Sequence, residues 1–148
     1  MTMKIKQISL FVENKPGTLH APCKILSDAG ISITTLSLAD TKFFGVLRML
    51  TADWQKAKEV LEQNGFAVRL TDVVAIEVDH KPGSMTNILD ILDRNGLNVE
   101  YMYAYAAGVN DKAALIFRFA DADEAIAKLQ NAPGIRIISG DMLPGMGK

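Results

Sequence analysis

Two segments of the chain contain the triplet Lys-Pro-Gly, and both could bind a small anion through backbone amides. They read Asn14-Lys15-Pro16-Gly17-Thr18-Leu19 and His80-Lys81-Pro82-Gly83-Ser84-Met85. Proline fixes one backbone angle and glycine has no Cβ, so a ligand can approach the main chain closely. A helix is predicted after each triplet, and the N–H groups of its first turn attract negative charge. The same residues are also typical of a tight turn that binds nothing.

The rest of the sequence offers no set of residues with the spacing of a catalytic or metal site. His20 and His80 have no Cys or carboxylate partners at metal-ligand spacing, so we predict no metal. No Ser-His-Asp set, glycine-rich phosphate loop or pair of catalytic carboxylates is apparent. The sequence therefore favours a protein that is not an enzyme and has no cofactor.

The two triplets belong to an internal repeat that covers most of the chain. Lys-Pro-Gly recurs at an offset of 66 residues (83 − 17), and Gly30-Ile31-Ser32-Ile33 falls on Gly96-Leu97-Asn98-Val99 at the same offset. Further on, Arg48 aligns with Arg118 at an offset of 70 (118 − 48). The offset changes only where loops are expected, so we infer one structural unit present twice.

Each repeat is predicted to contain four strands and two helices. Alternating apolar residues indicate a first strand around Ile8 and around Ile76, and the first helices end at Ala29-Gly30 and Asn95-Gly96. The other strands are predicted at 31–39, 44–50 and 66–70, and at 97–106, 113–120 and 135–139. The second helices have Asp53 and Asp121 as N-caps, the latter in a capping box with Glu124, and end near residues 64–65 and 133–134. Pro22 should delay or bend the first helix of repeat one.

The predicted fold class is therefore α+β, with two βαββαβ units packed side by side. Right-handed crossovers place both helices of a unit on one face of an antiparallel sheet with strand order 4-1-3-2. We expect domains at 1–70 and 73–140 and a flexible tail at 141–148. A unit of about 70 residues is marginally stable alone, and the linker Thr71-Asp72 is short, so the units should pack together.

Composition argues against several classes of protein. The 148 residues include 16 basic and 17 acidic side chains, so the basic excess of many nucleic-acid-binding proteins is missing. No apolar run reaches the roughly eighteen residues of a membrane span. The first seven residues lack the apolar region of a secretory signal. We expect a cytoplasmic protein with no nucleic-acid or membrane partner.

Both repeats resemble the ACT domain, a ferredoxin-like regulatory module, over residues 5–140. The resemblance rests on a strand, the Lys-Pro-Gly turn, and a helix that ends in Ala-Gly-Ile-Ser-Ile (29–33) or Asn-Gly-Leu-Asn-Val (95–99). The chain as a whole is similar to small stand-alone proteins that contain two ACT domains. The resemblance implies a non-enzymatic regulatory protein that binds a free amino acid at an interface between ACT domains.

The resemblance also implies which residues hold the ligand. In the serine-binding ACT domain of phosphoglycerate dehydrogenase, one Asn precedes the turn and another begins the second strand of the neighbouring unit. The first position corresponds to Asn14 or His80, and the second to Asn98 or Ser32, although Asn is also common in turns. We expect a better site at Asn14, Lys15, Pro16, Gly17, Thr18, Leu19, Asn98 and Val99. A weaker site would comprise His80, Pro82, Gly83, Ser84, Met85, Ser32 and Ile33.

An alternative hypothesis is an interaction subunit that regulates a metabolic enzyme without binding a small molecule. By strand alternation, Arg48 and Arg118 point away from the helices, beside apolar side chains. A sheet face of this mixed character favours contact with a partner enzyme or with a second copy of the chain. We expect a homodimer under either hypothesis, and the sequence does not name the amino acid.

Overall fold

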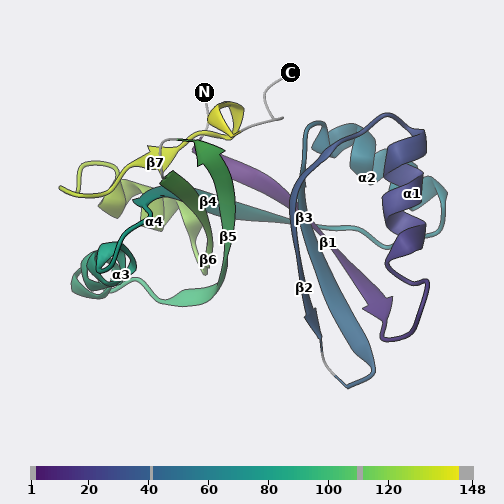
Figure 1. Ribbon diagram of the computed structural model, residues 1–148, viewed down its shortest axis with the longest axis horizontal. Helices are drawn as coiled ribbons and strands as arrows, with labels where there is room; N and C mark the ends of the chain where they lie inside the picture. The colour runs from purple at the N-terminus through teal and green to yellow at the C-terminus, as the bar shows by residue number, and fades with distance from the viewer. Residues whose placement is uncertain (1–2, 41, 110–111, 144–148) are drawn as a thin grey trace. The chain divides into compact units, whose positions relative to one another are not determined.

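The computed structural model describes residues 3–40, 42–109 and 112–143 (Figure 1). The chain divides into two compact units. The first, here called the repeat-one unit, comprises residues 6–71 together with Leu143. The second, the repeat-two unit, comprises residues 3–5 and 72–142. The domain ranges of 1–70 and 73–140 stay predictions.

The repeat-one unit has the predicted order of elements. They are β1 (Lys4–Glu13), α1 (His20–Asp28), β2 (Ile33–Asp40), β3 (Phe44–Thr51), α2 (Trp54–Gln63) and the start of β4 (Arg69–Asp79). The strands follow the order β2-β3-β1-β4, which confirms the predicted 4-1-3-2 arrangement read from its other edge. Both helices cover one face of the sheet (Figure 1), where Leu26 of α1 and Leu61 of α2 pack against alternate residues of β1 and β3.

The repeat-two unit repeats this arrangement. Its further elements are α3 (Ser84–Arg94), β5 (Val99–Val109), β6 (Lys112–Phe119), α4 (Ala122–Leu129), β7 (Ile137–Ile138) and a 3₁₀ turn (Gly140–Met142). The order β7-β4-β6-β5 again confirms 4-1-3-2, and the strand pairs β4–β6, β4–β7 and β5–β6 are antiparallel. Phe117 and Phe119 lie in the core between the sheet and the helices, with ring centroids 5.6 Å apart. A fully buried side chain of this kind contributes about 1.5–3 kcal/mol to folding.

Strand pairing corrects the predicted alignment of the third strands. Ile8 lies opposite Met49 in the repeat-one unit, and Val74 lies opposite Phe117 in the repeat-two unit. The third strands therefore correspond at an offset of 68 (117 − 49) rather than 70. Arg48 and Arg118 are not equivalent positions, because two strands of alternating apolar residues also match after a shift of two.

A single strand replaces the linker that we predicted between the repeats. β4 (Arg69–Asp79) includes Thr71 and Asp72, which we had expected to separate two strands. The intervening sequence contains no Gly or Pro that would break a strand, and Thr and Val favour extended structure. Polar residues therefore interrupt the alternating apolar pattern of the sequence, but the strand continues through them.

The first helix of repeat one starts late, as Pro22 predicted. α1 begins at His20, whereas α3 begins at Ser84, which corresponds to Thr18. The late start puts Pro22 at the third helical position, where an N–H group would have no partner within the helix. If α1 began at Thr18, the backbone nitrogen of Pro22 would have to donate a helical hydrogen bond, and proline has no N–H group.

The helix ends use the predicted caps. The side chain of Asp53 accepts a hydrogen bond from the Lys56 N–H, and that of Asp121 accepts one from the Glu124 N–H. Gly30, Gly65 and Gly96 follow helices with positive φ angles, which glycine adopts without strain. Glu124 forms an ion pair with Lys128 at 2.9 Å. The last predicted boundary was wrong, because α4 ends at Leu129, before Pro133.

Removal of either cap should destabilise the protein by a similar amount. We expect Asp53→Ala and Asp121→Ala each to lower the free energy of unfolding by about 1 kcal/mol, because a first-turn N–H group loses its acceptor. Urea denaturation measures the change. Asp28→Ala is the matched control, since its carboxylate forms an exposed ion pair with Lys24 and its loss should change stability by about 0.5 kcal/mol or less. Equal losses in all three variants would contradict the capping role.

The predicted tail starts with regular structure. Residues 140–142 form a 3₁₀ turn, in which the Met142 N–H donates to the Ser139 carbonyl at 3.0 Å. Leu143 is only 3% exposed. Residues 144–148, the rest of the predicted tail, lie outside the described residues. Across the ranges that the structure describes, no helix is long and apolar enough to span a membrane.

Candidate functional site

The Lys-Pro-Gly turn of repeat one joins β1 to α1. Gly17 has a φ angle of 89°, and its neighbours from Asn14 to Gly17 are exposed. The Thr18 hydroxyl lies within 2.6 Å of the Glu13 carbonyl and 2.9 Å of the Lys15 carbonyl, so it donates to its own turn. Leu19 is the N-cap residue and offers no side-chain acceptor, so nothing from that side chain competes with a ligand for the first N–H groups of α1.

The turn of repeat two has the same backbone form. Gly83 has a φ angle of 88° and is the N-cap residue of α3, again without a side-chain cap. The Ser84 N–H donates to the Lys81 carbonyl at 3.3 Å, which is the counterpart of the Thr18 N–H donating to Lys15 at 3.5 Å. The structure thus brings His80, Pro82 and Gly83 together in one turn, and Ser84 and Met85 begin the helix of 11 residues that follows.

The strand-two residues predicted to contact a ligand lie just before or at the start of β2 and β5. Asn98 and Ser32 are exposed and precede their strands, and the Ser32 carbonyl accepts from the Ala52 N–H at 3.2 Å. Val99 and Ile33 instead pack against the cores of their own units. That packing reduces the surface they could offer to a ligand, whereas Asn98 and Ser32 keep theirs.

A cavity of about 390 Å³ lies beside the repeat-two turn. The turn contributes His80 and Pro82 to its lining, the start of α3 contributes Ser84 and Met85, and the sheet contributes Ala104, Ala113 and Leu115. The small side chains of Ala104 on β5 and Ala113 on β6 leave the space open. This volume lies within the range of about 300–1,000 Å³ that is common for small-molecule sites.

The equivalent space in repeat one is much smaller, at about 60 Å³. Leu38 pairs with Leu47 as Ala104 pairs with Leu115, so Leu38 and Ala104 occupy equivalent places. The Leu38 side chain lies over Gly45, because a Cβ built on that glycine would be 2.9 Å from Leu38 Cδ1. Leu38 thus fills the space that the alanine leaves empty in repeat two.

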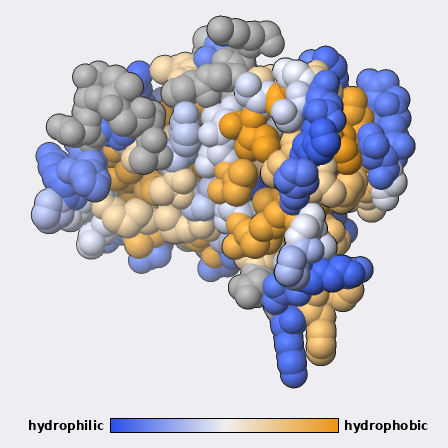
Figure 2. Space-filling model, turned by 45° about the vertical axis from the view of Figure 1, so that its right-hand side comes forward, coloured by the Kyte–Doolittle hydropathy of each residue, from blue (hydrophilic) through white to orange (hydrophobic). Residues whose placement is uncertain are grey.

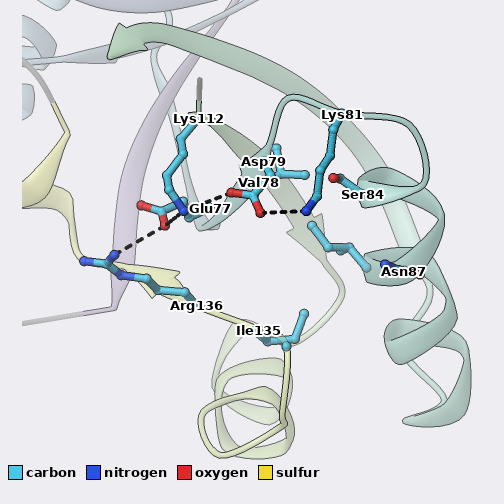
Figure 3. Close-up of a pocket in the computed structure, with 11 residues that line it drawn as sticks. Glu77, Val78, Asp79, Lys81, Ser84, Asn87, Lys112, Ile135 and Arg136 are labelled. Atoms are coloured by element: carbon cyan, nitrogen blue, oxygen red, sulfur yellow. Dashed lines mark hydrogen bonds and ion pairs between the residues drawn. The ribbon is translucent and has the colours of Figure 1, made fainter. Parts of the chain in front are cut away.

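A second cavity of the repeat-two unit has about 400 Å³ and a charged rim (Figure 3). Lys112 Nζ lies 2.9 Å from Asp79 Oδ1 and 3.4 Å from Glu77 Oε1. Arg136 Nη1 lies 3.3 Å from the same Glu77 oxygen, and Lys81 Nζ lies 3.9 Å from Asp79 Oδ2. Five side chains therefore form a row of alternating charge, with Arg136 and Lys81 at its two ends (Figure 3).

The row of charges shifts the pKa values of two of its members, Asp79 and Lys112. The hydrogen bond from Lys112 lowers the pKa of Asp79, and the hydrogen bonds to Asp79 and Glu77 raise the pKa of Lys112. Both shifts favour the charged forms of Asp79 and Lys112. In the described part of the chain, no three His, Cys, Asp or Glu side chains gather as a metal centre would require.

The pKa of Asp79 gives a testable pH dependence. Its folded-state pKa lies below that of the unfolded chain, so its stabilising contribution is complete above the ordinary aspartate value of about 3.9. The contribution is lost as the pH falls through the folded-state value. NMR titration of the side-chain carboxyl should show this lowered pKa, and Lys112→Gln should raise it toward the ordinary value. Lys24→Gln, which removes a cation that pairs with Asp28, should leave the pKa of Asp79 unchanged.

The cavity-lining residues on the strands were not among the predicted site residues. Leu38 and Ala104 are separated by the repeat offset of 66, and a comparison of side-chain volume at aligned positions would have singled them out. Gly45 and Ala113 could not be aligned correctly from the sequence, because the third-strand offset was wrong by two. Glu77, Lys112 and Arg136 lie in strands or next to them, where charged residues usually indicate only a solvated face.

Comparisons with known proteins agree with the duplicated architecture. A family model described as "ACT domain pair" matches residues 3–132. The crystal structure of protein BT0572 from Bacteroides thetaiotaomicron is similar over 95% of this chain and 96% of its own, with 34% sequence identity and a TM-score of 0.88. The ligand-free regulatory subunit of aspartate kinase from Thermus thermophilus is similar over 86% of this chain and 90% of its own, with 18% identity and a TM-score of 0.64. A search of curated proteins found no match.

Proposed function

Since this chain belongs to the ACT domain pair family, we propose that it is a non-enzymatic regulatory protein that binds a free amino acid at its Lys-Pro-Gly turns. The observation that carries the proposal is the turn of repeat two. There, a glycine with positive φ begins an uncapped helix directly beside a cavity of about 390 Å³. A backbone anion site and a space for a side chain are thus adjacent.

The proposed binding mode divides the ligand between two parts of the site. The α-carboxylate accepts hydrogen bonds from N–H groups at the start of the helix, where the helix dipole also favours negative charge. The ligand side chain enters the cavity, where Met85 and Leu115 provide apolar contacts and Ala104 provides room. The α-ammonium is held by the amides that the family resemblance suggests, Asn14 with Asn98, or by His80 with Ser32 at the reciprocal site.

The two turns are proposed to differ in the side chains that they accept. The amides contact groups common to all amino acids, so Asn14 and Asn98 strengthen binding without selecting a side chain. Volume selects the side chain, and about 60 Å³ beside the repeat-one turn admits only the smallest amino acids. An amino acid with a larger side chain requires the repeat-two turn, with about 390 Å³.

A thermal-shift screen against the twenty amino acids tests the proposal. A ligand at about 100 times its Kd adds about 2.7 kcal/mol of stability. In a chain of this length, that gain should raise the melting temperature by about 5–10 °C. The response should decrease in Asn14→Ala and Asn98→Ala if those amides hold the α-ammonium. Absence of a shift with every amino acid would contradict amino-acid binding.

A second candidate function is contact with a metabolic enzyme. Apolar side chains reach the surface of the molecule (Figure 2). In the repeat-one unit the exposed large ones include Phe11, which is 67% exposed, and Phe43, Phe44 and Leu36. Exposed aromatic groups are common where proteins associate.

Light scattering on the purified chain would test the expected homodimer, and a monomer at micromolar concentration would contradict it.

A further inference from the structure

We propose that the charged cavity of the repeat-two unit is a separate binding site for an acidic amino acid. This is the cavity of about 400 Å³ whose rim carries the row Arg136–Glu77–Lys112–Asp79–Lys81 (Figure 3). The charged cavity adjoins the one beside the Lys-Pro-Gly turn, since both are lined by Val78, Asp79, Lys81 and Ser84, but the proposal does not require a ligand side chain in the space beside Ala104 and Ala113.

Charge complementarity points to this ligand class. The rim has three cations and two carboxylates, which leaves one positive charge in excess. An acidic amino acid has the opposite set, with two carboxylates, one ammonium group and one negative charge in excess. Arg136 and Lys81 can each receive a carboxylate of the ligand, and Glu77 or Asp79 can receive its ammonium group. Neutral amino acids and simple anions each match only part of this set.

The geometry of the cavity fits a ligand with two separated carboxylates. Arg136 and Lys81 lie at opposite ends of the row of charged side chains, with Lys112 between them (Figure 3). Ser84 and Asn87, in the first turns of α3, line the cavity beside Lys81, so the positive end of the helix dipole supports the carboxylate at that end. Val78 and Ile135 also line the cavity and offer apolar contact to the methylene groups between the two carboxylates.

Repeat one shows that the fold does not require these charges. β3 places Phe44 opposite Glu13, as β6 places Lys112 opposite Asp79, so Phe44 and Lys112 are equivalent. Phe11 corresponds to Glu77 at the offset of 66. Gly65 and Gly134, both with positive φ, follow the second helices at an offset of 69 (134 − 65), and at that offset Ala67 corresponds to Arg136. Only the Glu13–Lys15 ion pair, at 2.7 Å, retains the pattern of Asp79 and Lys81. The row of charges is therefore a property of repeat two, added to a backbone that folds without it.

A ligand can insert into the row at small energetic expense. Arg136 is 61% exposed in its side chain and Lys81 is 70% exposed, so their ion pairs are largely solvated. Exposed ion pairs contribute little to stability, because water competes for both partners. The Glu77 side chain is only 20% exposed. It forms ion pairs with both Lys112 and Arg136, which hold it in place within the row.

Calorimetric titration of the full chain at low salt tests the site with L-glutamate and L-aspartate as probes. We expect saturable binding of at least one of them. The corresponding amide amino acid lacks the second carboxylate, and the corresponding dicarboxylate lacks the ammonium group. Each of these should bind about tenfold more weakly than the probe. The probe itself should bind about tenfold more weakly to the Arg136→Gln variant than to the unchanged chain. Arg94→Gln is the matched control, because Arg94 forms an exposed pair with Asp90 on α3 and does not line the cavity.

A second variant locates the bound probe. Ala104→Leu combined with Ala113→Gly reproduces in repeat two the Leu38 and Gly45 pair that fills the space in repeat one, and neither residue lines the charged cavity. Retention of probe binding in this double variant, with loss in Arg136→Gln, is the expected result. Loss in the double variant with retention in Arg136→Gln would overturn the proposal. Absence of binding at millimolar concentrations, or equal affinities of Arg136→Gln and Arg94→Gln, would overturn it as well.

Discussion

The double substitution Ala104→Leu/Ala113→Gly should strongly weaken the binding of any amino acid whose side chain occupies the repeat-two cavity. The leucine would occupy the space that Leu38 occupies in repeat one, where only about 60 Å³ is left. The ligand would then lose the burial of its side chain, worth about 1.5–3 kcal/mol for an apolar group. A loss of this size weakens binding by about tenfold to 100-fold. Calorimetry with the amino acid found in the thermal-shift screen measures the change.

Two single variants separate the volume effect from loss of stability. Ala113→Gly alone should lower stability by up to about 1 kcal/mol, because glycine is unfavourable inside a strand, but should retain binding. Leu38→Ala should enlarge the repeat-one cavity and allow a larger side chain at that turn. Unchanged affinity in the double variant would show that the cavity beside Gly83 does not receive the ligand side chain.

Replacement of Phe117 by alanine should lower the free energy of unfolding more than any of the other substitutions described above. Phe117 on β6 is fully buried, and its ring packs against that of Phe119 within the core of the repeat-two unit. Removal of a buried phenyl ring costs about 3–5 kcal/mol through lost transfer free energy and the remaining cavity. This is a large part of the stability of an ordinary domain. Urea denaturation should show the loss, and hydrogen exchange should show lower protection within residues 72–142.

The matched control is the same substitution at an exposed position. Phe11 on β1 is 67% exposed, so Phe11→Ala removes little buried area and should lower stability by no more than about 1 kcal/mol. Similar losses in the two variants would mean that Phe117 is not the core residue that the structure describes.

The sequence predicted the features that depend on local chemistry. Asp53 and Asp121 cap their helices, Gly30 and Gly96 end theirs, and Pro22 delays α1, because each of these effects acts within a few residues. The strand order followed from the handedness of crossovers, which does not depend on detailed packing. Two βαββαβ units could therefore be predicted from the repeat alone.

Features that depend on register and volume could not be predicted in this way. An alternating apolar strand matches equally well after a shift of two, so the sequence aligned Arg48 with Arg118, whereas strand pairing aligns Met49 with Phe117. The cavity beside Gly83 depends on how little space Ala104 and Ala113 fill together, and their proximity is visible only after β5 and β6 are paired. The row of charges likewise requires the pairing of Asp79 with Lys112.

The most direct test of amino-acid binding at the Lys-Pro-Gly turn is an NMR titration that follows backbone amides. With the amino acid that gives the largest thermal shift, we expect saturable changes at the amides of Gly83 and Met85, because their N–H groups are proposed to meet the ligand carboxylate. The amides at the start of α2 and α4, whose caps are intramolecular, should stay unchanged. Unchanged amides at both Lys-Pro-Gly turns, while the ligand still raises the melting temperature, would contradict the proposed site.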